Sequence, residues 1–506
     1  MSIGASPQPL RSRDHTSPIY VAGRCLILLA LFTAAAVYQA FHASASFNND
    51  VWWHIRTGLW ILTNHAIPRT GLFSRYSALA WIDPSWGYEA VLSTAYNLFG
   101  LRAIPMLLMV FRVALAVVTF LIALGWRGQF WRAILLSAAA QYVIVDLQPT
   151  PESISIILFG VELMLLLESR QPGKERLLWW LPLLFVFWAN LHIQFALGLL
   201  ALGWFLLAVS AEQVLRSMGV TWFSVRQPPM RLQTIGLATV ASIIFAGINP
   251  YGFRLYGVVL KNAYSEVTFR YLAEMRNMSF RRPQHYAFLL LVMLAFFFLG
   301  RRRSKDFFQL GILVAGSLLA FRIQRDAWCV ALPAIAILAR TWGVEDFFPA
   351  SPFRSARWKW EKVSLAVIVL AAFAGAASRI PNPAVMMEKL ANAYPVKACD
   401  WIRANHPPQP LFNTYEWGGF LTWYLPEYPV AIDGRIGLYG NELTEQYFTV
   451  TGGGQRLEMD PAFSQSRTIL LKRDSGMAQA LTTLPALKPF YRVAYSDERA
   501  VFLVRQ

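Results

Sequence analysis

Long apolar runs recur along the first 379 residues, and they constrain the fold more than any other feature of the chain. The first run is Val21–Ala43, which lacks a small-residue cleavage site close behind it and is therefore expected to stay as an anchor helix. A bilayer crossing needs about 20 mostly apolar residues, and fewer inside a packed bundle. The further candidate spans are 103–125, 133–147, 154–168, 177–190, 193–211, 232–250, 286–300, 307–323, 326–341 and 362–379. We predict a mainly α, polytopic helical membrane protein with about 11–13 transmembrane helices.

The composition agrees with this class. Only 15% of residues are charged, against roughly 25% in soluble domains, and the mean hydropathy is +0.40. A disordered chain, a disulfide-rich secreted scaffold and an ordinary cytosolic enzyme are thereby excluded. The three cysteines suggest no disulfide, because Cys25 and Cys329 lie in apolar runs and Cys399 lies in a polar region.

The net charge of +17 belongs entirely to the apolar part of the chain. Residues 380–506 hold 12 basic and 12 acidic residues, which leaves 34 basic and 17 acidic for residues 1–379. Such an excess is typical of cytoplasmic loops and not of a nucleic-acid-binding patch, so we expect no nucleic-acid partner.

Every second loop between the runs is basic, and this alternation predicts the orientation. The basic residues are Arg127, Arg132, Arg170, Lys174, Arg176, Arg216, Arg226, Arg231, Arg301, Arg302, Arg303, Lys305, Arg354, Arg357, Lys359 and Lys362. With these loops and the polar arm 1–20 in the cytoplasm, the outer segments are 44–88, 148–153, 190–194, 249–285, 322–326 and everything after 380. Eleven crossings satisfy this orientation if 86–100 lies in the membrane interface. The expected location is the bacterial inner membrane.

The tail, residues 380–506, is predicted to be a soluble α/β domain on the outer side. Short strands are expected at 410–412, 429–432 and 468–471, and helices at 417–425, 441–448 and 477–484. Segments 491–495 and 500–504 are typical of a terminal hairpin. Alternating strands and helices favour a small, mostly parallel layered sheet.

The first outer loop carries an acid at the start of a predicted amphipathic helix. From Asp50, helical spacing places Trp53, His54 and Thr57 on one face. Two interpretations are open: a functional carboxylate, or an interfacial aromatic belt with Asp50 as the helix N-cap.

Other unusual polar residues gather on the same outer side. They are Asp146, Gln148, Glu152, Asn190, His192, Gln194, Asn249, Glu274, Arg276, Arg322, Arg325 and Asp326. Polar groups at bilayer depth are costly and usually line a cavity or a substrate path, although each one alone could be a helix cap or a loop charge. The sequence contains no Walker loop, dinucleotide-binding glycine pattern, HExxH, CxxC or GxSxG motif. Energy from a nucleotide bound to this chain is therefore not expected.

Several segments resemble the bacterial GT-C-type glycosyltransferases, the polytopic enzymes akin to protein O-mannosyltransferases and lipid A aminoarabinose transferases. The matching segments are Asp50–Gly58, Ile67-Pro68, Phe73-Ser74, Trp81, Trp86, Trp188–His192, Asn249–Gly252, Tyr415–Gly419 and Ile432–Gly440. The resemblance spans most of the chain and implies a GT-C-like transmembrane domain at 21–379. The family places an acid in the first outer loop, and only Asp50 matches that position. Val51 stands where many relatives carry a second acid.

The resemblance also implies roles for individual residues. The donor would be a polyprenyl-phosphate-linked sugar, and the acceptor a lipid, a glycan or a protein. Asp50 would be the general base. The phosphate would meet Arg322, Arg325 and His54, and the substrates would be oriented by Gln148, Glu152, Asn190, His192 and Glu274. No cofactor is certain, although a divalent metal is compatible with this chemistry.

The tail offers a further candidate contact with the acceptor. Asn413, Asp433 and Arg435 follow predicted strands, where layered sheets form their ligand crevice. The alternative is a structural turn in which Asp433 bonds to its own backbone. For the whole chain, the alternatives to an enzyme are a transporter or flippase and a catalytically silent scaffold of cell-envelope glycan assembly. The absence of an internal repeat argues against the transporter.

Overall fold

The computed structural model describes residues 18–41, 47–125, 129–220, 229–302, 306–342, 358–453, 457 and 460–506. Most of the predicted cytoplasmic arm 1–20 lies outside these residues. So do the predicted loop residues Arg127, Arg226, Arg303, Lys305, Arg354 and Arg357.

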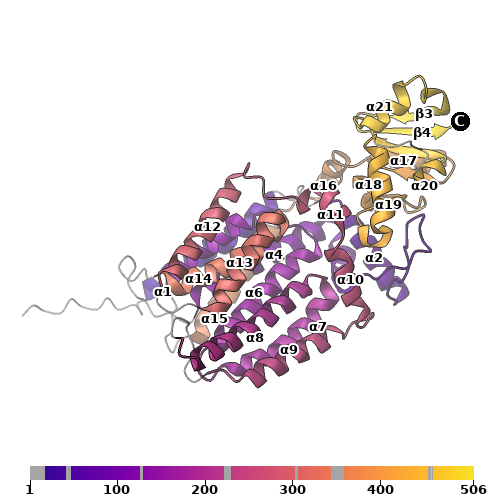
Figure 1. Cartoon of the computed structure of the whole chain (residues 1–506). Helices are drawn as coiled ribbons and strands as arrows, with labels where there is room; N and C mark the ends of the chain where they lie inside the picture. Colours follow the sequence, from indigo (N-terminus) through magenta and orange to yellow (C-terminus); the bar gives the residue numbers. More distant parts are fainter. Residues whose placement is uncertain are drawn as a thin grey trace, which may run out of the picture.

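A bundle of apolar helices forms the larger part of the molecule, and the tail stands at one end of it (Figure 1). The bundle helices are α1 (Pro18–Phe41), α4 (Ala103–Leu124), α5 (Phe130–Val143), α6 (Pro151–Ser169), α7 (Leu181–Leu191), α8 (Phe195–Ser217), α9 (Leu232–Ala246), α12 (Pro283–Gly300), α13 (Phe307–Arg322), α14 (Trp328–Thr341) and α15 (Trp358–Ala377). They coincide with the eleven predicted apolar runs. The predicted helical membrane fold is therefore confirmed.

Three described helical segments are long and apolar enough to cross a bilayer: Trp86–Leu124, Phe195–Ser217 and Pro283–Gly300. Shorter apolar helices cover Ala22–Tyr38, Leu232–Ala246 and Phe307–Arg322. The predicted number of crossings and their orientation stay predictions. Helix α14 lies at the centre of the bundle, since every residue from Trp328 to Ala339 is buried.

Two further helices bring the first outer loop to the tail end of the bundle. They are α2 (Val51–Asn64) and α3 (Trp86–Phe99), and η2 (Gly100–Arg102) joins α3 to α4. Helices α2 and α3 cross closely at Gly58, where an added Cβ would lie 2.1 Å from the Glu89 carbonyl oxygen. The hydroxyl of Ser93 donates to the Ile55 carbonyl at 2.8 Å. Because glycine allows this approach, the two helices form one unit.

Two short helices connect α9 to α12 across the same end. They are α10 (Arg254–Ala263) and α11 (Glu266–Tyr271), followed by η4 (Ala273–Met275). The short η5 (Gln324–Ala327) links α13 to α14. Figure 1 shows α10 and α11 where the bundle meets the tail.

The tail contains a four-stranded sheet in the order β1-β2-β4-β3. Its strands are β1 (Leu411–Asn413), β2 (Thr468–Lys472), β3 (Tyr491–Ser496) and β4 (Ala500–Arg505). Its helices are α16 (Pro383–Ala391), α17 (Val396–Asn405), α18 (Tyr415–Tyr424), α19 (Ile436–Thr451), α20 (Pro461–Ser464) and α21 (Gly476–Thr483). The predicted hairpin is present as β3 and β4.

Two predictions about this sheet are wrong. Only β1 and β2 pair in parallel, whereas β2–β4 and β4–β3 are antiparallel, because the terminal hairpin joins the sheet next to β2. The predicted strand at 429–432 is not a strand of this sheet. Instead, Val430 forms an isolated parallel bridge with Ser74, and its amide donates to the Phe73 carbonyl at 3.1 Å. The apolar segment that suggested a strand is buried against the first outer loop.

Candidate active site

Asp50 lies just before α2, at the junction of the bundle and the tail. Its Oδ1 accepts a hydrogen bond from the Trp53 indole at 3.2 Å, and its backbone amide donates to Asn48 at 2.7 Å. Asp50 occupies the N-cap position, but its side chain makes no capping hydrogen bond. The carboxylate is therefore turned away from the helix backbone, and capping does not explain why an acid stands here.

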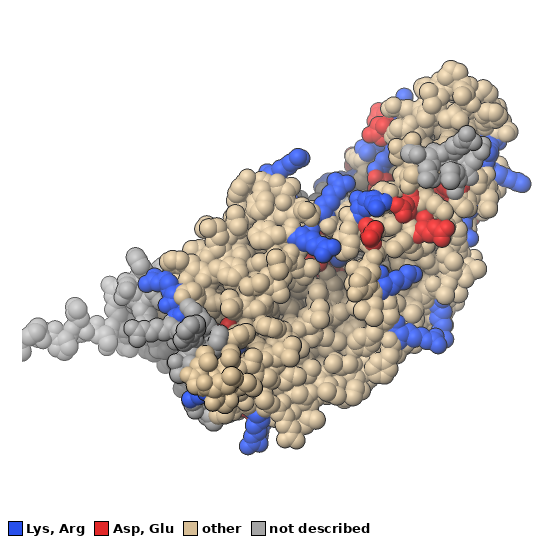
Figure 2. Space-filling model, in the orientation of Figure 1, with Lys and Arg blue, Asp and Glu red and all other residues tan. Residues whose placement is uncertain are grey.

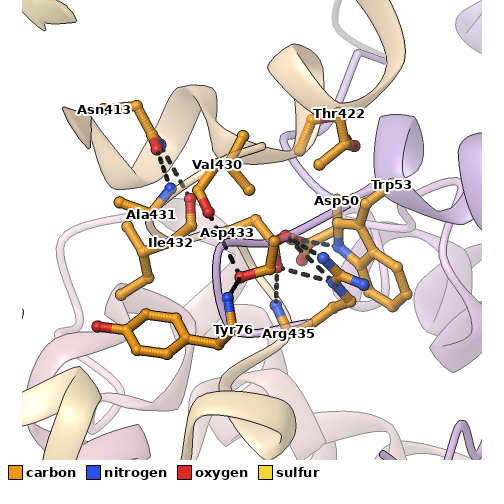
Figure 3. A network of polar contacts seen from close by, with 12 residues as sticks. Asp50, Trp53, Tyr76, Asn413, Thr422, Val430, Ala431, Ile432, Asp433 and Arg435 are labelled. Carbon is orange, nitrogen blue, oxygen red and sulfur yellow. Dashed lines mark hydrogen bonds and ion pairs between the residues drawn. The ribbon is translucent and has the colours of Figure 1, made fainter. Parts of the chain in front are cut away.

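The tail closes over Asp50 through glycines. An added Cβ at Gly434 would lie 1.8 Å from Asp50 Oδ1, and one at Gly419 would lie 2.3 Å from the Asn49 carbonyl oxygen. Both distances are far below van der Waals contact, so only a residue without a side chain fits at either position. Figure 3 shows Asp50 and Trp53 beside Asp433 and Arg435 of the tail. The site is built from both parts of the chain.

Asp433 and Arg435 form a closed ion pair under this contact. Arg435 Nη2 lies 2.6 Å from Asp433 Oδ2, and the Arg435 backbone amide donates to Asp433 Oδ1 at 2.9 Å. Both side chains are buried, and the Arg435 guanidinium lies 5.1 Å from the Trp81 ring centroid. The geometry is that of the predicted structural turn. A direct contact of either residue with an acceptor stays a prediction.

Asn413 holds this turn from below. Its Nδ2 donates to the Ile432 carbonyl at 2.9 Å, and its Oδ1 accepts from the Ala431 amide at 2.8 Å. The residue is fully buried at the end of β1. This geometry supports a positioning role for Asn413 in place of the predicted contact with an acceptor, because both ends of its amide are already bonded inside the protein.

Arg325 gathers three acids from three separate segments. Its guanidinium lies 3.2 Å from Glu274 in η4, 3.6 Å from Glu152 in α6 and 3.6 Å from its neighbour Asp326. Gln194 donates to Asp326 at 3.1 Å. Among the described residues, the buried Arg325 Nε has no hydrogen-bond partner. One N–H of this cation is therefore left for a further oxygen acceptor.

Arg322 lies apart from this cluster. It is exposed and its guanidinium lies 5.6 Å from the Phe269 ring centroid. The sequence grouped it with Arg325 because the two are close along the chain. The turn between α13 and η5 sends their side chains to different places.

The electrostatics connect Asp50 to these groups. Burial raises the pKa of Asp50 to about 7, and the negative charges of Glu274 and Asp433 act in the same direction. The Trp53 hydrogen bond and the Arg325 charge oppose the increase. A carboxylic acid with a pKa near neutrality can both take up and release a proton at physiological pH.

The predicted histidines are both buried and neutral. His54 Nδ1 lies 2.9 Å from Glu89 Oε1, and His192 Nδ1 lies 2.8 Å from the Ser155 hydroxyl. Burial lowers the pKa of His54 well below its usual value, and the nearby His192 and Arg435 add to this effect. A neutral His54 does not supply the positive charge that the predicted phosphate contact requires.

Two further predicted residues have structural surroundings. Asn190 bridges three helices, because its Oδ1 accepts from Trp86 at 3.0 Å and its Nδ2 donates to the carbonyls of Val186 and Ile248 at 2.8 Å. The half-buried Gln148 precedes α6, and its carbonyl accepts from the Ser153 hydroxyl at 2.6 Å. Neither residue contacts Asp50 in any hydrogen bond of the described residues.

Sequence reasoning missed two buried acids beside the site. Asp83 and Glu89 are both fully buried, and Glu89 is the partner of His54. Asp83 Oδ1 accepts from the Ser85 amide at 2.9 Å, and its own amide donates to the Tyr251 hydroxyl at 3.2 Å. The signal was a lone acid inside the apolar segment 86–100. Over the part of the chain that the structure describes, no group of three His, Cys, Asp or Glu side chains is placed to hold a metal ion.

Comparison with solved structures shows the same fold in membrane glycosyltransferases. The oligosaccharyltransferase AglB from Archaeoglobus fulgidus, in complex with an inhibitory peptide and a dolichol-phosphate, is 11% identical, with a TM-score of 0.55 over 93% of this chain and 72% of that one. The apo form of the oligosaccharyltransferase from the same organism gives 12% identity and a TM-score of 0.53 over 97% and 75% of the two chains. The predicted GT-C fold is thereby confirmed.

A third similar structure is ArnT from Cupriavidus metallidurans bound to undecaprenyl phosphate. It is 16% identical, with a TM-score of 0.48 over 95% of this chain and 98% of that one. Neither a protein-family model nor a curated protein sequence matches the chain.

Proposed function

We propose that this protein is a membrane glycosyltransferase that moves a sugar from a polyprenyl-phosphate-linked donor to an acceptor at the outer face of the bacterial inner membrane. The observation that carries the proposal is the buried Asp50 carboxyl, with a pKa of about 7, at the junction of an apolar bundle and a polar tail. The lipid of the donor would stay in the bilayer while its phosphate and sugar reach this junction. The GT-C fold supports the same chemistry.

The reaction has a defined place for each charge. The acceptor hydroxyl oxygen forms a bond to the anomeric carbon while the bond from that carbon to the phosphate oxygen breaks. Asp50 takes the proton of the hydroxyl as general base, and the electron pair leaves with the lipid phosphate. A single base on the face opposite the leaving group supports inversion at the anomeric carbon.

Arg325 is the proposed cation for the departing phosphate. Its Nε–H is buried without a hydrogen-bond partner among the described residues, and a charge-assisted bond to a phosphate oxygen would fill it. Glu152, Glu274 and Asp326 hold the guanidinium from the other sides. These acids also keep the surroundings of Asp50 negative, which supports its raised pKa. A divalent metal remains a separate proposal that this donor set does not require.

The decisive experiment measures bond cleavage in the donor. Purified protein in nanodiscs is supplied with a panel of radiolabelled polyprenyl-phosphate sugars and with candidate lipid, glycan and peptide acceptors. We expect release of polyprenyl phosphate with label on one acceptor class, and at least ~10²-fold slower transfer by Asp50→Asn. Movement of an intact donor across the bilayer without cleavage would instead identify a flippase. Binding of a glycan assembly partner with no turnover of any donor would identify a scaffold.

A further inference from the structure

The helix α10 presents a face that the bundle and the tail leave uncovered. The face comprises Phe253, Arg254, Gly257, Leu260, Lys261 and Tyr264, all of which are exposed. At 100° per residue they span an arc of roughly 120°, so they form one continuous surface. The opposite side is anchored: Leu255 is buried, and the Tyr256 hydroxyl donates to the Ile243 carbonyl of α9 at 2.7 Å. The orientation of the helix is therefore determined by packing.

This outward face of α10 combines large apolar side chains with two cations. Phe253 is 62% exposed, Leu260 60% and Tyr264 81%, and Tyr264 is the most exposed large apolar side chain of the described residues. Arg254 and Lys261 lie two helical turns apart on the same face, and no ion pair is recorded for either of them among the described residues. Water favours neither exposed aromatic rings nor a helix of this pattern, whereas a membrane interface favours both.

The outward face continues a lipid-facing surface of the bundle. Leu237, Val240, Ile244 and Ile248 are exposed along one side of α9, and the turn after Ile248 leads directly to Phe253. Figure 2 shows that the visible flank of the bundle is almost free of charge, and that Lys and Arg gather where the bundle meets the tail. The face therefore begins where the apolar surface ends, at the depth of lipid headgroups.

We propose that α10 docks on the outer leaflet, with Phe253, Leu260 and Tyr264 inserted between headgroups and with Arg254 and Lys261 bound to anionic phospholipid phosphates. The partner is the bilayer surface itself. Each cation near an anionic surface adds attraction that salt screens, whereas the apolar contacts do not depend on salt. This proposal is independent of the glycosyl transfer proposed above.

The docked helix would also fix the height of the tail above the bilayer. Directly after α10, the Ser265 hydroxyl donates to Asn441 of α19 at 2.7 Å, and Arg270 of α11 pairs with Glu445 at 2.6 Å. The rings of Tyr271 and Phe448 stack with centroids 4.5 Å apart. Through these three contacts, α10 and α11 join the membrane surface to the tail residues that cover Asp50.

A spin label on α10 tests whether the face lies in the bilayer. Leu260→Cys is labelled in a full-length background that carries Cys25→Ser, Cys329→Ala and Cys399→Ala, in nanodiscs with and without phosphatidylglycerol. We expect stronger relaxation of the label at 260 by dissolved oxygen than by a water-soluble nickel chelate. The exposed tail position Ser496→Cys is the control and should show the opposite order. A label at 260 that behaves like the control would overturn the proposal and leave the face to a protein partner.

A charge-removal pair tests the role of the cations. In the labelled chain, phosphatidylglycerol should increase the depth of position 260, and Arg254→Gln with Lys261→Gln should abolish that increase. Arg492→Gln with Arg499→Gln removes the same charge from the far strands of the tail and should leave the increase intact. An equal depth in neutral and anionic nanodiscs for the parental chain would refute the binding of anionic headgroups. Circular dichroism on each variant separates these outcomes from misfolding.

Discussion

Gly434 of the tail lies directly on Asp50 of the first outer loop, so close that a methyl group at position 434 would overlap the carboxylate at 1.8 Å. The contact joins two residues from opposite ends of the chain. It explains how the carboxyl can be buried although α2 lies at the edge of the bundle. The tail is thus part of the candidate site and not an appended domain.

The first prediction concerns this contact. Gly434→Ala should displace the Asp50 carboxylate and lower the rate of sugar transfer by about 10²-fold, the effect of a misplacement near 1 Å. The matched control is Gly437→Ala, because the nearest atom to an added Cβ there is 4.0 Å away. Both variants are purified, and their initial rates are compared at saturating donor. Equal rates in the two variants would show that the position of Asp50 is unimportant.

The second prediction is the pH profile. A base with a pKa of about 7 is protonated below neutrality, so the rate should fall tenfold per pH unit there and level off above pH 8. Trp53→Phe removes an indole hydrogen bond that favours the charged form, and the midpoint should therefore move to higher pH. Rates measured from pH 5 to 9 decide the matter. A profile that is flat across pH 7 in the parental protein contradicts the role of Asp50.

The third prediction is a stability effect of the same pKa. The pKa of Asp50 is raised above its ordinary value of 3.8, so the folded state holds this proton more tightly than the unfolded state does. The stability contributed by the proton is complete below pH 3.8 and is lost as the pH rises to 7. Asp50→Asn should consequently raise the thermal unfolding midpoint at pH 8 and change it much less at pH 5. An identical shift at both pH values would mean that Asp50 titrates normally.

The fourth prediction separates the two interpretations of Asp433. Asp433→Ala leaves the guanidinium of Arg435, which is only 1% exposed, without its partner and should cost about 3–5 kcal/mol of stability. Asp433→Ala combined with Arg435→Leu should recover a large part of that loss. Thermal unfolding in detergent provides the comparison. If Asp433→Ala unfolds like the parental protein and only the acceptor requirement increases, the residue contacts acceptor instead.

The fifth prediction compares two neighbouring arginines. Arg325→Ala removes the common partner of Glu152, Glu274 and Asp326, whereas Arg322→Ala removes an exposed side chain near Phe269. Donor titrations should therefore show a larger increase in KM for Arg325→Ala, with Arg322→Ala close to parental values. A larger effect of Arg322→Ala would move the phosphate to the outer surface of α11.

Much of the fold was predictable from the sequence, because its determinants are local. A run of about 20 apolar residues forms a helix wherever it meets a bilayer, and backbone groups must pair within the segment. The eleven runs therefore appear as eleven helices, and the acid before α2 could be recognised from its neighbours alone. The tail hairpin was equally local, since two strands and a tight turn are contiguous in the chain.

Contacts between distant segments decided the rest. The partner of Val430 is Ser74 and not a strand of the tail, so the pattern of one segment could not reveal the pairing. Glu89 joined the site only when α3 packed on α2 and met His54. The sequence by itself determined a membrane bundle with an acid at its outer edge. Only the tertiary structure determined that the tail buries this acid, because desolvation of Asp50 depends on atoms that lie nearly the whole chain away.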